Sequence, residues 1–129
     1  MMRTLALSLL SFALIAPGAL AQATWSQLSP AASPPGCAGM QAVSDGANLF
    51  FFGGNLGSRV MSDRIWSFDG TTWSDASPAS GSTPPGRDWY AAAWDGQNMV
   101  VFGGRDTNNA DLGDTWTWDG NSWTQHTPA

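Results

Sequence analysis

The chain has 129 residues and a formal net charge of −5, from five basic and ten acidic residues. Every basic residue is arginine and every acidic residue is aspartate. This balance leaves no basic patch for a polyanion, so we do not expect nucleic-acid binding. The only cysteine, Cys37, excludes a disulfide within the chain. We expect it to be a buried apolar residue and not a reactive thiol, because no His or Arg adjoins it in sequence.

Residues 1–21 have the organisation of a secretory signal peptide. Arg3 supplies a positive charge, an apolar run covers residues 5–16, and Ala19-Leu20-Ala21 has the small-x-small form that signal peptidase accepts. The alternative is a membrane anchor, but this run is shorter than the roughly 20 apolar residues that cross a bilayer, and no later run is longer. We therefore expect cleavage after Ala21 and a protein secreted to the extracellular space or the periplasm.

Residues 22–38 are predicted to hold one strand and a linker. The segment Trp25-Ser26-Gln27-Leu28-Ser29-Pro30 matches two later segments that begin at Trp73 and Trp123 and also end in proline. Those later segments close a group of strands, whereas residues 24–28 have no such group before them. We therefore expect an orphan outer strand at residues 24–28.

The rest of the chain repeats with a period of fifty residues. The first copy of the most similar stretch, residues 48–73, reads NLFFFGGNLGSRVMSDRIWSFDGTTW, and residues 98–123 read NMVVFGGRDTNNADLGDTWTWDGNSW. A repeat at a fixed period determines the architecture. Each period contains four short predicted strands separated by turn signals, and Gly, Pro and Asp-Gly interrupt every window long enough for a helix. We expect the first unit at residues 39–78, and a linker with the second unit at residues 79–129.

Asp-Gly pairs at residues 45–46, 69–70, 95–96 and 119–120 mark the predicted hairpins. A two-residue turn would place Trp66 opposite Trp73, and Trp116 opposite Trp123 in the second unit, and we expect all four in the core. The second strand of each unit, at residues 49–52 and 99–102, is apolar throughout. That pattern predicts a strand buried on both faces.

These spaced elements resemble kelch repeats of the galactose-oxidase-type β-propeller superfamily. They are Phe-Gly-Gly after the second strand, an Asp shortly before a Trp, Trp-Asp-Gly-x-x-Trp, and Pro-Pro-Gly-Arg at residues 84–87. The resemblance implies an all-β fold of two four-stranded antiparallel kelch blades plus the orphan outer strand. The ring would be incomplete, because closed propellers have roughly four to eight blades. Residues 67–73 also approach the Asp-box of sialidase-like propellers, which predicts the same fold.

Cys37 departs from the kelch pattern, since it stands where the second repeat has Arg87. The long connections of the two units should fall together on one side of the blades, and the tight Asp-Gly turns on the other. Loops on a rigid scaffold are where binding is usually found. The candidate ligand-binding residues on that side are Arg87, Asp88, Trp89, Tyr90, Arg105 and Asp106.

Aromatic faces beside Arg and Asp suit a sugar ring, which packs its C–H face on the aromatic and bonds through its hydroxyls. The alternative is that Trp89 and Tyr90 begin an innermost strand and pack between blades. Arg87 would then bond to loop carbonyls.

We expect no catalytic residue, metal or cofactor. Four oxygen-bearing side chains lie close in sequence, Asp106, Asn108, Asp111 and Asp114. The EF-hand order is broken by Ala110, and the chain has no glutamate. Galactose-oxidase chemistry would require copper ligands that include His and Tyr, and a Tyr–Cys crosslink. The chain offers only His126, Tyr90 and Cys37 for these roles, and the sialidase set is not assembled either.

The expected function is a secreted module that recognises a glycan or a protein and is not catalytic by itself. One alternative is the N-terminal part of a secreted propeller enzyme, galactose-oxidase-like or sialidase-like, whose catalytic residues lie outside this chain. Another is a degenerate fragment without independent function. Two blades leave open sheet faces, so we also expect self-association, or additional blades that close the ring. In a ring of copies the orphan strand would compete with the last outer strand, which predicts a marginally stable or polydisperse chain.

Overall fold

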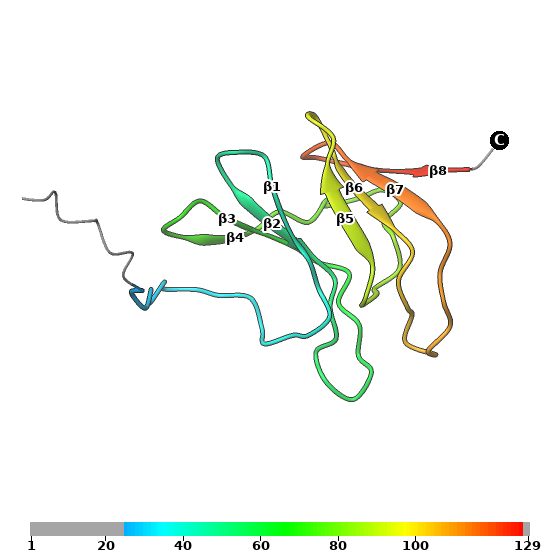
Figure 1. The fold of residues 1–129 in the computed structure, drawn as a ribbon, viewed down its shortest axis with the longest axis horizontal. Coiled ribbons are helices and arrows are strands. Elements are labelled where there is room, and N and C mark those ends of the chain that lie inside the picture. The colour runs from blue at the N-terminus through cyan, green and yellow to red at the C-terminus, as the bar shows by residue number, and fades with distance from the viewer. Residues whose placement is uncertain (1–24, 128–129) are drawn as a thin grey trace, which may run out of the picture.

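The computed structural model describes residues 25–127, which form two four-stranded antiparallel sheets (Figure 1). The expected signal peptide lies outside these residues. The first sheet, blade 1, has the order β1-β2-β3-β4, and the second, blade 2, has the order β5-β6-β7-β8. The strands are β1 (Ala42–Ser44), β2 (Leu49–Phe52), β3 (Ile65–Phe68), β4 (Trp73–Asp75), β5 (Ala91–Trp94), β6 (Met99–Phe102), β7 (Thr115–Trp118) and β8 (Trp123–His126). The prediction of an all-β fold with two four-stranded antiparallel blades is confirmed. No membrane-crossing helix occurs in residues 25–127.

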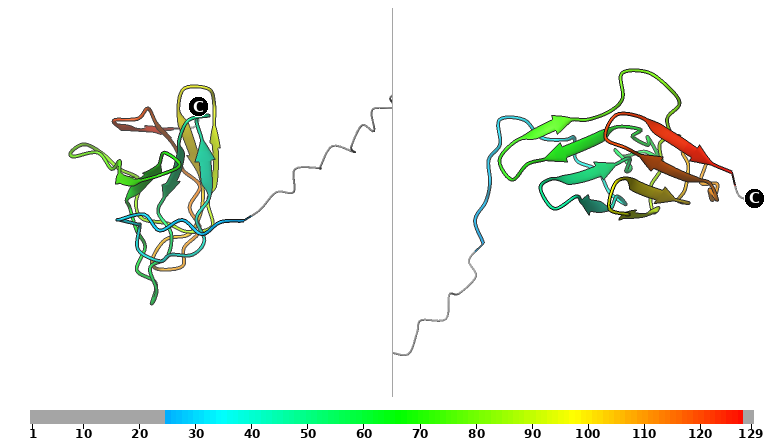
Figure 2. Two further views of the ribbon diagram at one scale, coloured as in Figure 1. Left: turned by 90° about the vertical axis from the view of Figure 1, so that its left-hand side faces the viewer. Right: turned by 90° about the horizontal axis from the view of Figure 1, so that it is seen from above.

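The two blades pack face to face. Seen from above in Figure 2, the sheets stand side by side, with β1 and β5 at one edge and β4 and β8 at the other. The inner strands β1 and β5 contact each other. This arrangement gives each blade one face that touches its neighbour and one face that points away from it.

The hairpin turns are longer than the Asp-Gly pairs predicted. In the first hairpin Ser44 pairs with Leu49, so the turn consists of the four residues 45–48. The Asp45 carboxylate accepts hydrogen bonds from the backbone N–H groups of Ala47 at 2.8 Å and Asn48 at 2.7 Å. The same two bonds recur at Asp69, Asp95 and Asp119. They hold the pKa of each of these four carboxyls below its usual value.

The longer turn shifts the register by two residues, so the expected pairs of Trp66 with Trp73 and Trp116 with Trp123 are wrong. Trp118 lies directly opposite Trp123. Phe68 lies opposite Trp73 in the same way, with ring centroids 4.8 Å apart. A carboxylate that bonds to two successive N–H groups needs the additional turn residues, and a two-residue turn would not provide them.

The hydrophobic core lies between the two sheets. Its buried members are Val43, Phe50, Phe52, Ile65, Tyr90, Met99, Val101, Trp116, Trp118 and Trp123. Phe50 meets Trp118 edge to face at 5.0 Å, and Phe52 meets Trp123 at 4.9 Å. The core position expected for the tryptophans is therefore confirmed for Trp116 and Trp123. Their counterparts in blade 1 are only half-buried, because they lie on the face that points away from blade 2.

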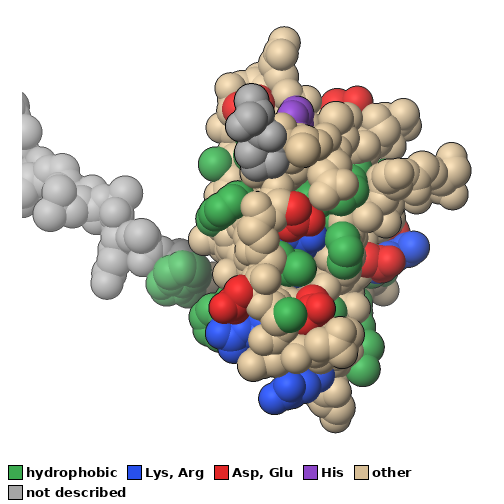
Figure 3. Space-filling model, turned by 90° about the vertical axis from the view of Figure 1, so that its right-hand side faces the viewer, with side chains coloured by type: hydrophobic (Ala, Val, Ile, Leu, Met, Phe, Trp, Pro, Cys, Tyr) green, Lys and Arg blue, Asp and Glu red, His purple; other side chains and the backbone are tan. Residues whose placement is uncertain are grey.

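The second strand of each blade is not buried on both faces, contrary to the prediction. Phe102 is 53% exposed and Leu49 is 39% exposed. The physical reason is that each sheet has one neighbour in the described part of the chain. Figure 3 looks onto the side of blade 2, where hydrophobic side chains are visible among charged ones. We call the outward faces of the two sheets the open face of blade 1 and the open face of blade 2.

The expected outer strand at residues 24–28 is not formed over its described part. Residues 25–30 pair with no strand, and the Trp25 side chain is fully exposed. Both sheets already end in an outer strand of their own, β4 and β8. Each sheet in the described residues therefore already has its four strands, without a contribution from this segment.

The core predicts a large difference between two tryptophan truncations. Trp123→Ala removes an indole that packs on Phe52, so it should lower the free energy of unfolding by about 3–5 kcal/mol. Trp25→Ala removes a fully exposed side chain and should change it by less than about 0.5 kcal/mol. Urea unfolding followed by circular dichroism measures both. Equal transition midpoints for the two variants would contradict the assignment of the core.

Candidate ligand-binding site

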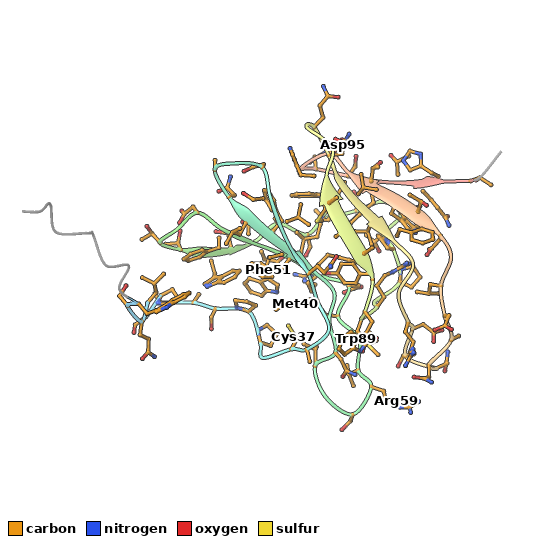
Figure 4. The ribbon with its side chains drawn as sticks, in the orientation of Figure 1. Cys37, Met40, Phe51, Arg59, Trp89 and Asp95 are labelled. Carbon is orange, nitrogen blue, oxygen red and sulfur yellow. The ribbon has the colours of Figure 1, made fainter. Side chains whose placement is uncertain are left out.

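The long connections of both blades gather on one side of the molecule, as the sequence predicts. They run between β2 and β3, between β6 and β7, and from β4 to β5. In Figure 4, Arg59 and Trp89 lie on this side, whereas Asp95 lies at a turn on the opposite side. The hydroxyl of Thr107 donates a hydrogen bond to the Arg59 carbonyl at 2.5 Å, which joins two of the loops.

Arg87 is completely buried. Its guanidinium donates to Gly103 O at 2.9 Å and to both carboxylate oxygens of Asp114, at 2.5 Å and 2.9 Å, while Nε donates to Pro85 O at 3.1 Å. The Arg87 carbonyl accepts a bond from the N–H of Gly54 in blade 1 at 2.8 Å. These contacts match the alternative in which Arg87 bonds to loop groups, and they leave it no surface for a ligand.

The carboxyl of Asp114 is strongly acidic because of Arg87. The bidentate bonds from the guanidinium, together with a bond from the Trp116 indole at 2.7 Å, lower the pKa of Asp114 to about 2. A fork-to-fork pair of this kind fixes geometry as well as adding stability.

Tyr90 and Asp88 are buried as well. The Tyr90 hydroxyl donates to the Phe52 carbonyl and accepts a bond from the Gln41 N–H at 3.2 Å. Burial raises the pKa of Tyr90. The backbone of Asp88 exchanges two hydrogen bonds with Arg105, at 3.1 Å and 2.9 Å. Tyr90 thus joins the start of β5 to blade 1, and Asp88 joins it to the loop that follows β6.

Trp89 differs from its neighbours, because its side chain is 74% exposed. Its backbone has a positive φ of 54°. The equivalent residue of the first repeat is Gly39, whose φ is 72°. A conformation that glycine adopts freely costs a residue with a β-carbon about 1–3 kcal/mol. Aligning the two repeats places a tryptophan at a glycine position, and this was a signal that the sequence analysis did not use.

Trp89 stands between two shallow depressions. One, of about 360 Å³, includes Phe102, Arg105 and Asp111, and the other, of about 400 Å³, includes Met40 and Gln41 from blade 1. Arg105 is partly exposed, and its Nε lies 3.4 Å from a carboxylate oxygen of the exposed Asp111. An exposed indole is therefore flanked by a charged pair on one side and by an apolar side chain on the other.

The last candidate, Asp106, faces solvent but serves its own loop. Its carboxylate accepts bonds from the N–H groups of Asn108 and Ala110, both at 2.8 Å, and these bonds lower its pKa. Within residues 25–127 no three His, Cys, Asp or Glu side chains lie close enough together to hold a metal ion.

Cys37 is half-buried and unpaired within the described chain. Its sulfur lies 3.3 Å from that of Met40. Burial raises the pKa of the Cys37 thiol.

The ion pair of Arg87 with Asp114 predicts a dependence of stability on pH. The folded pKa of Asp114 lies below its ordinary value of 3.8, so the stabilisation is present above pH 4 and is lost as the pH falls towards about 2. The loss amounts to about 2 kcal/mol. Asp114→Asn leaves Arg87 buried without its carboxylate, which should cost about 3–5 kcal/mol near neutral pH.

The measurement is the difference in unfolding free energy between wild type and Asp114→Asn at several pH values. This difference should shrink by about 2 kcal/mol at the lowest pH, because the wild-type carboxyl is then protonated as well. The exposed Asp111→Asn is the control. A difference that stays constant with pH would contradict the role of this pair.

Comparison with known proteins adds two findings. The model of the KLHDC2/KLHL20/DRC7 Kelch-repeats domain matches residues 18–129. A solved structure titled "Structure of YjhT" is similar in fold, with a TM-score of 0.58 and 23% sequence identity over 81% of this chain and 34% of that chain. The chain thus spans about a third of the length of that protein. A search of the curated proteins gave no match.

Proposed function

Because the chain belongs to the kelch-repeat β-propeller family, we propose that it is a recognition module that binds a protein ligand on its long-loop side, with Trp89 at the centre of the contact. Kelch-repeat domains mediate protein binding. The observation that carries this proposal is the exposed side chain of Trp89 at a position where the first repeat has glycine. The proposed role is binding and not catalysis.

The contribution of Trp89 to folding stability supports a role in binding and not in stabilising the native state. A tryptophan in a left-handed conformation destabilises the native state, and little burial offsets this, since most of its side chain is in solvent. Tryptophan and arginine are the residue types that most often dominate protein–protein contacts. Trp89 and Arg105 both line the first depression.

A glycan is the second candidate ligand. The indole of Trp89 offers a flat apolar face, and the charged groups of Arg105 and Asp111 lie on the rim of the same depression. This combination suits a sugar ring, whose C–H face packs on an aromatic while its hydroxyls form hydrogen bonds. A different proposal is that the chain is the N-terminal part of a secreted propeller enzyme whose catalytic residues lie outside it.

Trp89→Gly separates binding from stability. Glycine adopts the required φ without strain, so the unfolding free energy should stay the same or rise by about 1 kcal/mol, the gain being limited by the greater freedom of glycine in the unfolded chain. Binding should weaken by at least about thirtyfold, as expected for a central tryptophan. Wild type and variant, immobilised in parallel, are incubated with the extracellular protein fraction of the source organism and with a glycan array.

Proteins retained by the wild type and lost with Trp89→Gly support the protein ligand, and the same pattern on the array supports the glycan. The matched control is Asn121→Ala, an exposed substitution on the opposite, tight-turn side. If Trp89→Gly retains the same proteins and glycans as the wild type, this site is not the binding site.

We also propose that the chain is secreted, on the basis of residues 1–21. The N-terminus of protein recovered outside the cytoplasm should be Gln22 or its direct neighbour, because signal peptidase cleaves after a small residue. Edman degradation or terminal-peptide mass spectrometry determines it. An intact Met1 on the recovered protein would show that the segment is retained.

A further inference from the structure

The contact between the blades shows which two kinds of sheet face pack together in this molecule. Blade 2 covers blade 1 with Tyr90 at the start of β5 and with strand side chains, which are Met99, Val101, Trp116, Trp118 and Trp123. Fifty residues earlier, the open face of blade 1 has Leu49, Phe51, Trp66, Phe68 and Trp73. Each position is again a large apolar residue. The open face of blade 1 therefore presents the same kind of surface that blade 2 uses to cover its neighbour.

The open face of blade 2 corresponds in the same way to the covered face of blade 1. The covered residues are Val43, Phe50, Phe52 and Ile65, and their counterparts are Ala93, Val100, Phe102 and Thr115. The open face is hollowed, with a depression of about 220 Å³ lined by residues 91–93, Val100 and Phe102. Figure 3 looks onto this side of the molecule.

We propose that the chain associates head to tail with a second copy of itself, the open face of blade 2 in one copy packing on the open face of blade 1 in the next. The internal interface joins two unlike faces, and each open face is the repeat-equivalent of one of them. The new contact would therefore repeat the internal one. Such a heterologous contact builds an open assembly with one face of each kind free at its ends, and it closes into a ring where the rotation between copies allows it.

The contact between copies is filled by smaller side chains than the internal contact, although one substitution goes the other way. On the open face of blade 1, Phe51 stands where blade 2 has the smaller Val101, and its ring packs on Trp73 at 5.2 Å. On the open face of blade 2, Val100 stands where blade 1 has the larger Phe50. On the same faces Phe68 replaces Trp118, Ala93 replaces Val43 and Thr115 replaces Ile65. The contact between copies therefore contains less apolar volume than the internal one and packs less tightly.

A backbone bond can be repeated as well. Inside the chain, the N–H of Gly54 donates to the Arg87 carbonyl at 2.8 Å. The equivalent groups at the open faces are the N–H of Gly104 and the carbonyl of Cys37, and Gly104 N–H donates to no carbonyl among the described residues. Both groups are backbone, so the replacement of Arg87 by Cys37 does not remove the acceptor.

Two features of the internal contact are missing from the external one. Met40 replaces Tyr90, whose hydroxyl bonds to Phe52, and Ser44 replaces Trp94, whose ring stacks on Phe50 at 6.1 Å. The contact between copies should therefore be weaker than the internal one, and reversible. The orphan segment does not obstruct it, because residues 25–30 lie outside both sheets and the contact uses faces and not strand edges.

Two substitutions test the unlike pairing. Leu49→Asp places a charge on the open face of blade 1, and Val100→Asp does so on that of blade 2. The exported protein is examined by sedimentation velocity over a wide range of concentration. Wild type should form species that grow with concentration, and each variant alone should stay monomeric. The two variants mixed should form a one-to-one dimer that grows no further, because one intact face of each kind remains.

The proposal is overturned if the wild type is monomeric throughout, if either folded variant alone still assembles, or if the mixture stays monomeric. A wild-type monomer would leave the open faces to further blades of a longer chain. Circular dichroism verifies folding, and Leu49→Gln or Val100→Gln replaces a variant that fails to fold. Asn121→Ala, an exposed substitution in the turn between β7 and β8, lies outside both open faces and should associate like the wild type.

Discussion

Arg87 is the residue on which the junction of the two blades depends. Its carbonyl bonds to Gly54 in blade 1, and its guanidinium bonds to Gly103 O and Asp114 in blade 2. A single buried residue thus ties a loop of each sheet to the connection between them. Because the guanidinium is always charged and wholly enclosed, the carboxylate of Asp114 is required to balance it. The position of Trp89, two residues later, follows from this anchor.

The sequence predicted the fold well because the fold is repeated. The period of fifty residues, the Phe-Gly-Gly stops and the Asp-Gly turns each occur twice or more, so accidental matches were unlikely to agree. The register was harder to predict. Asp-Gly is typical of two-residue turns, but here the carboxylate of Asp45 and its counterparts accepts two backbone bonds and lengthens every turn. Two hydrogen bonds accepted by one side chain thus decided which residues face each other across the strands.

The candidate site was harder to predict than the fold, because adjacent residues at the start of β5 have opposite environments. Tyr90 is buried against Phe52, whereas Trp89 is exposed. Residue type alone does not indicate which of two neighbouring aromatic side chains is buried. Here the positive φ of Trp89 distinguishes it from Tyr90. The alignment of Gly39 with Trp89 contained that information, since glycine in one repeat indicates the backbone conformation required in the other. The contribution of Met40 and Gln41 to the second depression follows from the packing of the blades and has no signal in either repeat alone.

The position of the core has a consequence for the cooperativity of the molecule. Nearly all of the buried apolar side chains lie between the sheets, and neither sheet encloses a core of its own. If blade 2 separated, Phe50 and Phe52 would meet water, and if blade 1 separated, Trp118 and Trp123 would do so. Most of the apolar burial that stabilises the folded protein therefore lies in the contact between its two repeats. Although the sequence repeats once per blade, a single blade has no core of its own. The two blades should therefore unfold together as one cooperative unit.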